Sequence, residues 1–247
     1  MIHYAHSLPG HPTTENWQTL EAHSAGVASR ARSFASGFDS GDWAENAAWL
    51  HDLGKLDSIF QGYLLRENGL DDANYDSGRI NHSSAGAACA EEALGPCVGR
   101  ILAYLIAGHH AGLADWYTSD AGSAALSKRL DEAKENYDRI RVEAKSVLSH
   151  LIHALSPPLF LRKHPENLHL WMRMLFSALV DADYLDTWIQ VRSATHWVNE
   201  IPPIERRGEV PDRCHEGPKA KRFADGQGAR SASKHDLSGG SAQSLRN

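Results

Sequence analysis

The sequence predicts an all-α fold, and three observations support this. Apolar residues recur at helical spacing along most of residues 17–198. No stretch longer than a few residues alternates apolar and polar side chains, which is the pattern of a half-buried strand. The chain has 247 residues, 42% of them hydrophobic, which fits one ordinary globular domain. We therefore expect a single bundle of helices.

The first two helices are predicted over the N-terminal quarter of the chain. The second of these helices is expected to run from Trp43 to Leu53, where Gly54 ends it, so His51 and Asp52 occupy its last turn. His23 lies on the edge of the apolar stripe of the first helix. That stripe comprises Trp17, Leu20, Ser24, Val27, Ala31, Phe34 and Phe38.

The later helices bring further histidines to helix ends. After a polar loop, a third helix is expected to start at Ser83 or Ser84, both good N-caps, with His82 just before it. A fourth helix runs from Val98 into the pair His109 and His110 before Gly112. Residues 122–155 are expected to form one long amphipathic helix and residues 167–198 the last one, with Asp181 beside its inner face. That face comprises Trp171, Met174, Leu175, Ala178, Ala182, Leu185 and Ile189.

Charge divides the chain into two unlike parts. Residues 1–201 carry 16 Lys and Arg against 25 Asp and Glu, a net charge of −9, whereas residues 202–247 carry 9 against 6, a net charge of +3. In the second part, 15 of 46 residues are Gly, Pro or Ser, and large apolar residues are too few to offset the entropy of ordering. We expect a domain over residues 1–201 and a disordered tail or linker over residues 202–247.

The composition also indicates the cellular compartment in which the protein works. Three cysteines without a CxxC pair argue against a disulfide framework and for a reducing cytoplasm. The chain does not open with a signal peptide, and its longest apolar stretch, 101–107, is far shorter than the ~18 residues of a membrane span. We expect a cytoplasmic protein without a membrane partner.

Histidine is the compositional outlier, at 15 residues. Buried carboxylates require a compensating cation, and mixed imidazole and carboxylate sets suit Mn, Fe, Co, Ni or Zn better than Mg or Ca. Two ions ~3.5 to 4 Å apart can activate a water and neutralise a phosphate, which predicts phosphodiester hydrolysis. Each candidate ligand alone has an ordinary structural explanation, so the prediction of a metal site rests on the occurrence of all of them together. The set comprises His23, His51, Asp52, His82, His109, His110 and Asp181.

Several segments resemble the HD phosphohydrolase superfamily and, more closely, the HD nuclease domain of the CRISPR type I helicase-nuclease. The resemblance covers roughly residues 4–198, in the order of the family. It is carried by YAHS at 4–7, WQTLEAHSAGVA at 17–28, AAWLHDLGKLDSIFQGYL at 47–64, NHSSAGA at 81–87, LIAGHHAGLADW at 105–116 and FSALVDADYLDTW at 176–188.

The resemblance implies an all-helical HD-domain bundle that holds two divalent transition-metal ions, Mn, Fe, Co or Ni with Mg possible, and cuts single-stranded DNA. It makes Lys55 a group that orients or stabilises the scissile phosphate as a point charge. It makes Asp52 the bridge whose loss is most harmful. When the ligands of the family are transferred position by position to this sequence, the resemblance implies two ion sites. The first ion is held by His23, His51, Asp52 and Asp181, and the second by Asp52, His82, His109 and His110.

The sequence departs from the family in lacking the GxxxxGK[ST] loop of an ATP-driven motor. We therefore expect a separate or lost CRISPR helicase, together with the RNA-guided surveillance complex, as partners. One alternative is an HD phosphohydrolase of nucleotides or cyclic dinucleotides, although Gly62-Tyr63-Leu64 lacks the proline of the Gly-Tyr-Pro signature. Another is a catalytically idle, metal-stabilised interaction module.

Overall fold

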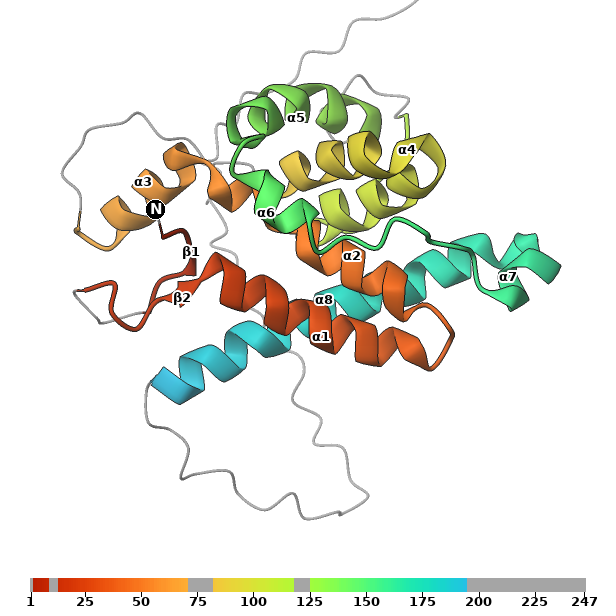
Figure 1. Cartoon of the computed structure of the whole chain (residues 1–247), viewed down its shortest axis with the longest axis horizontal. Helices are drawn as coiled ribbons and strands as arrows, with labels where there is room; N and C mark the ends of the chain where they lie inside the picture. The colour runs from red at the N-terminus through yellow and green to blue at the C-terminus, as the bar shows by residue number, and fades with distance from the viewer. Residues whose placement is uncertain (1, 9–12, 71–81, 118–124, 195–247) are drawn as a thin grey trace, which may run out of the picture. The chain divides into compact units, whose positions relative to one another are not determined.

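Two groups of helices meet at the second helix of the chain (Figure 1). In this computed structural model, which describes residues 2–8, 13–70, 82–117 and 125–194, α1 (Leu20–Ser36) and α2 (Gly41–Leu50) run side by side in front of α8 (Leu168–Ala194). The second group pairs α4 (Ser83–Gly108) with α5 (Leu126–Ile140). Because α2 also packs against α4, the end of α2 lies between the groups.

Shorter elements complete the described fold. A two-stranded antiparallel sheet pairs β1 (Tyr4–His6) with β2 (Gln18–Thr19), so that Tyr4 lies opposite Thr19 and His6 opposite Gln18. This pairing fastens the N-terminal segment to the start of α1. The remaining elements are η1 (Leu53–Leu56), α3 (Ser58–Glu67), α6 (Ala144–Leu148), α7 (Leu159–Lys163) and η2 (Pro165–Asn167).

Small residues let the helices approach closely at the interface between the two groups. A Cβ at Gly86 of α4 would overlap the carbonyl oxygen of Leu50, at the end of α2. A Cβ at Gly54 would likewise overlap the carbonyl oxygen of His82, to which the Gly54 amide donates at 3.2 Å. These two contacts place His51 and Asp52 directly beside the start of α4.

The helix α4 is bent in its middle. Gly95 has a φ of 77°, which is the left-handed region, and Pro96 follows it without an amide hydrogen to donate. The two straight parts on either side correspond to the third and fourth helices that the sequence predicts, and the second part ends at His109. The mostly helical architecture confirms the predicted fold class.

The structure corrects four details of the prediction. The second helix, expected to run to Leu53, ends at Leu50, so Asp52 follows it and Gly54 lies within η1. The single helix expected over residues 122–155 is replaced by α5 and α6, followed by a non-helical segment, and residues 122–124 lie outside the described part. The β1–β2 pair was not expected. Three residues assigned to the inner face of the last helix, Met174, Leu185 and Ile189, are 38–39% exposed.

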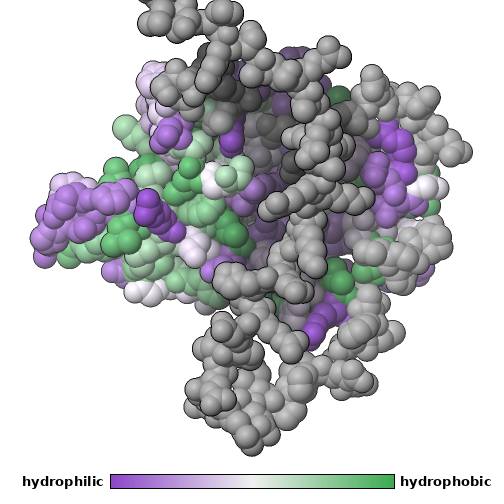
Figure 2. Space-filling model, turned by 180° about the vertical axis from the view of Figure 1, so that it is seen from behind, coloured by the Kyte–Doolittle hydropathy of each residue, from purple (hydrophilic) through white to green (hydrophobic). Residues whose placement is uncertain are grey.

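The buried face of α8 is instead formed by Trp171, Leu175, Ala178, Leu179, Ala182 and Asp186. Large apolar side chains on its other faces are exposed, and Figure 2 shows hydrophobic surface among the described residues beside a hydrophilic projection. Among the helices of the described residues, none is long and apolar enough to cross a membrane. The tail expected over residues 202–247 lies outside the described residues.

Candidate metal centre

Asp52 lies at the centre of the cluster of histidines. It follows the last turn of α2, its side chain is 2% exposed, and its two carboxylate oxygens face different partners. Oδ2 lies 3.4 Å from His23 Nε2 and 3.4 Å from His51 Nε2. Oδ1 lies 3.6 Å from both His82 Nε2 and His109 Nε2. One carboxylate therefore touches two separate sets of imidazoles.

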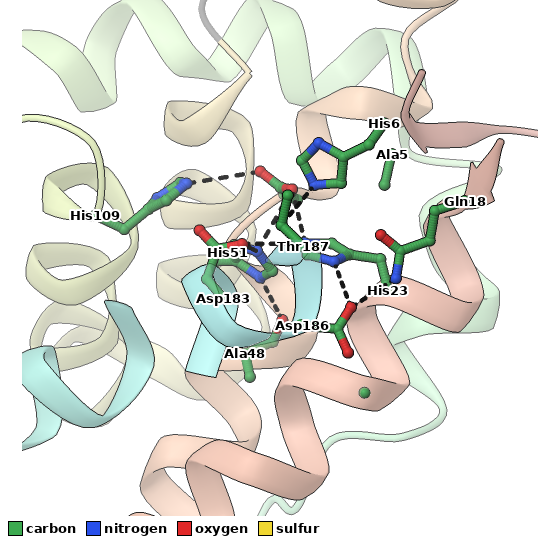
Figure 3. Close-up of polar contacts among 12 residues, drawn as sticks. Ala5, His6, Gln18, His23, Ala48, His51, His109, Asp183, Asp186 and Thr187 are labelled. Atoms are coloured by element: carbon green, nitrogen blue, oxygen red, sulfur yellow. Dashed lines mark hydrogen bonds and ion pairs between the residues drawn. The ribbon is translucent and has the colours of Figure 1, made fainter. Parts of the chain in front are cut away.

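The first set gains a second carboxylate from α8. Asp183 Oδ1 lies 3.3 Å from His23 Nε2 and 3.7 Å from His51 Nε2 (Figure 3). Ligands about 2.1 Å from one ion lie roughly 3.0 to 3.4 Å apart in octahedral or tetrahedral geometry, so most of these separations suit a shared ion. His23, His51, Asp52 and Asp183 thus form one group able to hold a metal.

The second set lies at the start and end of α4. His82 precedes the helix and His109 and His110 follow it, so they come together with Asp52 only because Gly54 and Gly86 admit α4 so closely. His82 Nε2 lies 2.9 Å from His110 Nε2. Of the three imidazoles, His109 is buried, His82 is half-buried and His110 is exposed, so this set faces solvent.

Local hydrogen bonds fix which ring nitrogen points inward. His51 Nδ1 lies 2.6 Å from the carbonyl oxygen of Ala48, and His109 Nδ1 lies 2.6 Å from that of Ile106. A carbonyl oxygen only accepts, so each Nδ1 carries the hydrogen and donates it. The Nε2 lone pair of each ring is left facing the carboxylates, which is the usual arrangement of a metal-bound histidine.

Unpartnered polar atoms mark the same place. Buried nitrogen and oxygen atoms normally find a hydrogen-bond partner, and each exception requires an explanation. Four of the atoms without one converge in this centre, namely His23 Nε2, His51 Nε2, His109 Nε2 and Asp52 Oδ1. A divalent ion is the partner that imidazole nitrogens and carboxylate oxygens share, so the residues present fit bound metal.

Without bound metal, the pKa values of several side chains in the centre are strongly shifted. Burial acts to raise the pKa of Asp52, but Lys55 and His51 outweigh it and hold that pKa well below its ordinary value. Burial acts to lower the pKa of His23, but the surrounding carboxylates of Asp183, Asp186 and Asp52 raise it to about 10. Burial lowers the pKa of His82 to about 4. At neutral pH His82 is therefore neutral, and burial lowers the pKa of His110 in the same direction.

The structure corrects the predicted position of the last carboxylate. Asp181 is exposed, and its carboxylate accepts a hydrogen bond from Ser177 Oγ at 3.3 Å. Asp183, two residues later, reaches the cluster instead. The error follows from the phase of α8, because the buried face passes through Ala182 and Asp186 and turns Asp181 away from His23.

His6 also borders the first set, which the sequence analysis did not predict. Its ring packs edge-on against the ring of His23 at 4.7 Å, and its Nε2 lies 3.2 Å from Thr187 Oγ1. Burial, followed by the charge of Lys55, lowers its pKa to about 3. Together with His23 and Asp183 it forms another group able to hold a metal. The β1–β2 pairing places it there.

Lys55 lies behind Asp52 and faces away from solvent. Its side chain is 5% exposed, and its Nζ lies 2.7 Å from Asp52 Oδ2 and donates to the carbonyl oxygen of Ala5 at 3.1 Å. Gln61 holds this region together, because its amide donates to the carbonyl oxygens of Lys55 and Tyr4. The side chain that was predicted to contact a phosphate thus forms an ion pair with the central carboxylate.

A helical bundle that gathers an His-Asp pair, further histidines and a second carboxylate defines the class of HD-domain, metal-dependent hydrolases. Comparison with family models gives the same result, because the model described as Cas3, HD domain, matches residues 16–185. The chain therefore belongs to the Cas3 HD family, the metal-dependent HD nucleases of CRISPR systems. No curated protein gave a match.

Proposed function

We propose that this chain hydrolyses the phosphodiester bonds of single-stranded DNA by a two-metal mechanism in CRISPR interference. One observation carries the proposal: the two oxygens of Asp52 face two different sets of imidazoles, at 3.4 Å and 3.6 Å. A single-ion site needs only one such set. The second set, with His82, His109 and His110, supports a second ion sharing the same carboxylate.

In this proposal, each position is built from nitrogen and oxygen donors, which suits Mn, Fe, Co or Ni, whereas Mg prefers oxygen alone. When bound, two divalent ions supply water activation and charge neutralisation on both sides of an in-line displacement at phosphorus. The first position comprises His23, His51, Asp52 and Asp183, and the second comprises Asp52, His82, His109 and His110.

The chain's own residues orient the ligands and leave one side open. Lys55 keeps Asp52 ionised and holds its Oδ2 in place, so we assign it as a positioning residue instead of a phosphate contact. Because His110 is exposed and His82 half-buried, a DNA strand would approach over the second position. The described side chains around Asp52 are imidazoles, carboxylates and a paired amine, so water is the nucleophile.

We assign the nuclease to residues 1–201. The net charge of −9 over this part opposes DNA binding, which usually relies on basic side chains. A separate CRISPR helicase and the RNA-guided surveillance complex would supply the single strand and the affinity for it.

The test compares wild type with Asp52→Asn, using Asp131→Asn on α5 as the control because Asp131 is exposed on the surface. Metal content is measured by mass spectrometry after loading with Mn or Co. Cleavage is measured on circular single-stranded DNA and on a cyclic dinucleotide, with and without chelator.

We expect about two ions in wild type and in the control, lost in Asp52→Asn, and nicking of the circle only with metal. Consumption of the cyclic dinucleotide with an intact circle would identify the small-molecule hydrolase instead. Metal binding without hydrolysis of either substrate would identify the idle module.

A further inference from the structure

His23 is oriented differently from the other two buried histidines of the centre. The Nδ1 atoms of His51 and His109 donate to backbone carbonyls, but His23 Nδ1 lies 2.9 Å from Asp186 Oδ2. Both side chains are buried, His23 at 0% and Asp186 at 7% exposure. A carboxylate on the outer nitrogen makes the imidazole a stronger donor to a metal than a neutral carbonyl does.

Asp186 is itself held at both oxygens. Gln18 Nε2 donates to its Oδ2 at 2.6 Å, and Arg30 Nη1 donates to its Oδ1 at 2.6 Å (Figure 3 draws the Gln18 contact). Arg30 Nη1 also donates to the carbonyl oxygen of Gly26 at 2.9 Å. The carboxylate therefore has little freedom to rotate away from His23, and its charge is balanced by a guanidinium.

Gly26 provides the space for this arrangement. A Cβ at this position would overlap Asp186 Oδ1 and crowd Arg30 Nη1. Glycine inside a helix costs about 0.5 to 1 kcal/mol relative to alanine, and Gly26 lies in the middle of α1. His23, Gly26 and Arg30 follow one another at helical spacing, so one face of α1 carries the ligand, the space and the counter-ion.

We infer that Asp186 is a positioning residue that, with Gln18, Gly26 and Arg30, fixes His23 with its Nε2 toward Asp52 and Asp183 and so sets the metal affinity of the first position alone. This inference rests on the proposed two-ion function. Asp186 lies one residue beyond the range that the family model matches. It touches none of the histidines assigned to the second position in the described contacts, so that position does not depend on it.

The test is metal titration of Asp186→Asn, which keeps the shape of the side chain and removes its charge. Metal content and affinity are measured by mass spectrometry and chelator competition, and the coordination of each position by the visible absorption of bound Co. We expect one of the two ions to bind about 10- to 100-fold more weakly, as for other outer-sphere partners, with the second unchanged. Asp131→Asn is the control and retains wild-type binding of both ions.

Two further measurements keep the inference testable if Asp186→Asn does not fold. Gly26→Ala displaces Asp186 without altering its charge, and we expect the same selective weakening. In wild type loaded with Zn, nuclear magnetic resonance of the His23 ring should show a hydrogen on Nδ1 and metal on Nε2. A ring metallated at Nδ1, or variants that hold both ions as tightly as wild type, would overturn the inference. A wild type that binds no ions would instead overturn the proposed function.

Discussion

Asp183 and Asp181 differ by two positions on one helix but face different surroundings. Asp183 lies 3.3 Å from His23, and the neighbouring imidazole, working against burial, holds the pKa of Asp183 below its ordinary value. Asp181 is exposed. An acid that faces the cluster and a solvated acid thus lie two positions apart in the sequence, and only their orientation on the helix separates them.

The first prediction compares these two residues. Asp183→Asn should weaken the first ion and lower cleavage of single-stranded DNA by at least about 100-fold, because it removes a charged ligand. Asp181→Asn should bind metal and cleave as wild type does. Metal content and initial cleavage rates check both. Loss of metal in Asp181→Asn with retention in Asp183→Asn would reverse the assignment.

The second prediction concerns Lys55→Met. Removing one partner of a buried ion pair leaves the other charge uncompensated, which costs about 3 to 5 kcal/mol. We expect this loss in the free energy of unfolding measured with urea and chelator, and a smaller loss with metal, because bound ions also balance Asp52. Unchanged stability combined with weaker DNA binding would show that Lys55 contacts phosphate after all.

At the scale of helices, the sequence predicts the positions of the helices along the chain better than it predicts which face of each helix is buried. The apolar periods give the helical segments, although α2 ends at Leu50 and Gly54, predicted to end it, lies within η1. The face of α8 was misjudged because its exposed side also carries large apolar residues, including Leu185 and Ile189. Periodicity cannot separate two apolar stripes on one helix.

The sequence patterns also could not predict which residues come into contact through tertiary packing. His6 reaches His23 through a strand pair of five residues in all, too short for an alternating pattern to reveal. Asp186 resembles a solvated acid until the apolar face of α8 is correctly placed. The histidines at helix ends could be predicted because each lies near a serine or a glycine that the sequence itself displays.

The third prediction tests the contact that joins α4 to α2. Gly86→Ala should lower the free energy of unfolding by about 1 to 3 kcal/mol or more, because the added methyl group overlaps the Leu50 carbonyl. Gly62→Ala in α3 is the matched control, since a Cβ there meets no atom within 4 Å. It should stabilise the protein by about 0.4 to 1 kcal/mol. Urea unfolding of the two variants measures both, and equal effects would contradict the packing argument.

For the molecule as a whole, the metal-free stability should depend on pH in both directions. The pKa of His23 is raised to about 10, so its contribution is complete below about 6.5 and is lost as the pH rises toward 10. Burial lowers the pKa of His6 to about 3 and that of His82 to about 4, so their contribution is complete above about 6.5 and is lost as the pH falls. The two trends place the maximum near pH 6.5.

The fourth prediction is a loss of about 2 kcal/mol in the unfolding free energy of the chelated protein between pH 7 and pH 9. Bound metal should abolish this loss, because it takes the place of the proton on His23. His23→Gln should abolish it without metal. Urea unfolding at each pH is the measurement, and an alkaline loss that persists in His23→Gln would assign it to another group.

The fifth prediction follows from the net charge of −9 over residues 1–201. The isolated protein should bind single-stranded DNA weakly and lose cleavage activity as salt increases, because the few phosphate contacts that it makes are screened. Cleavage rates between 50 and 300 mM salt, about the range over which such contacts weaken, are the measurement. A rate that does not change with salt would contradict a charge-dependent approach of the strand.

The different ways in which the histidines are held also have an evolutionary consequence. A backbone carbonyl is present whatever residue occupies position 48 or 106, so the rings of His51 and His109 keep their orientation through neutral drift at those positions. His23 depends on the identity of the residues at four positions, Gln18, Gly26, Arg30 and Asp186. We expect relatives to vary at positions 48 and 106 within the limits of packing. We expect them to keep or lose the residues at positions 18, 26, 30 and 186 together.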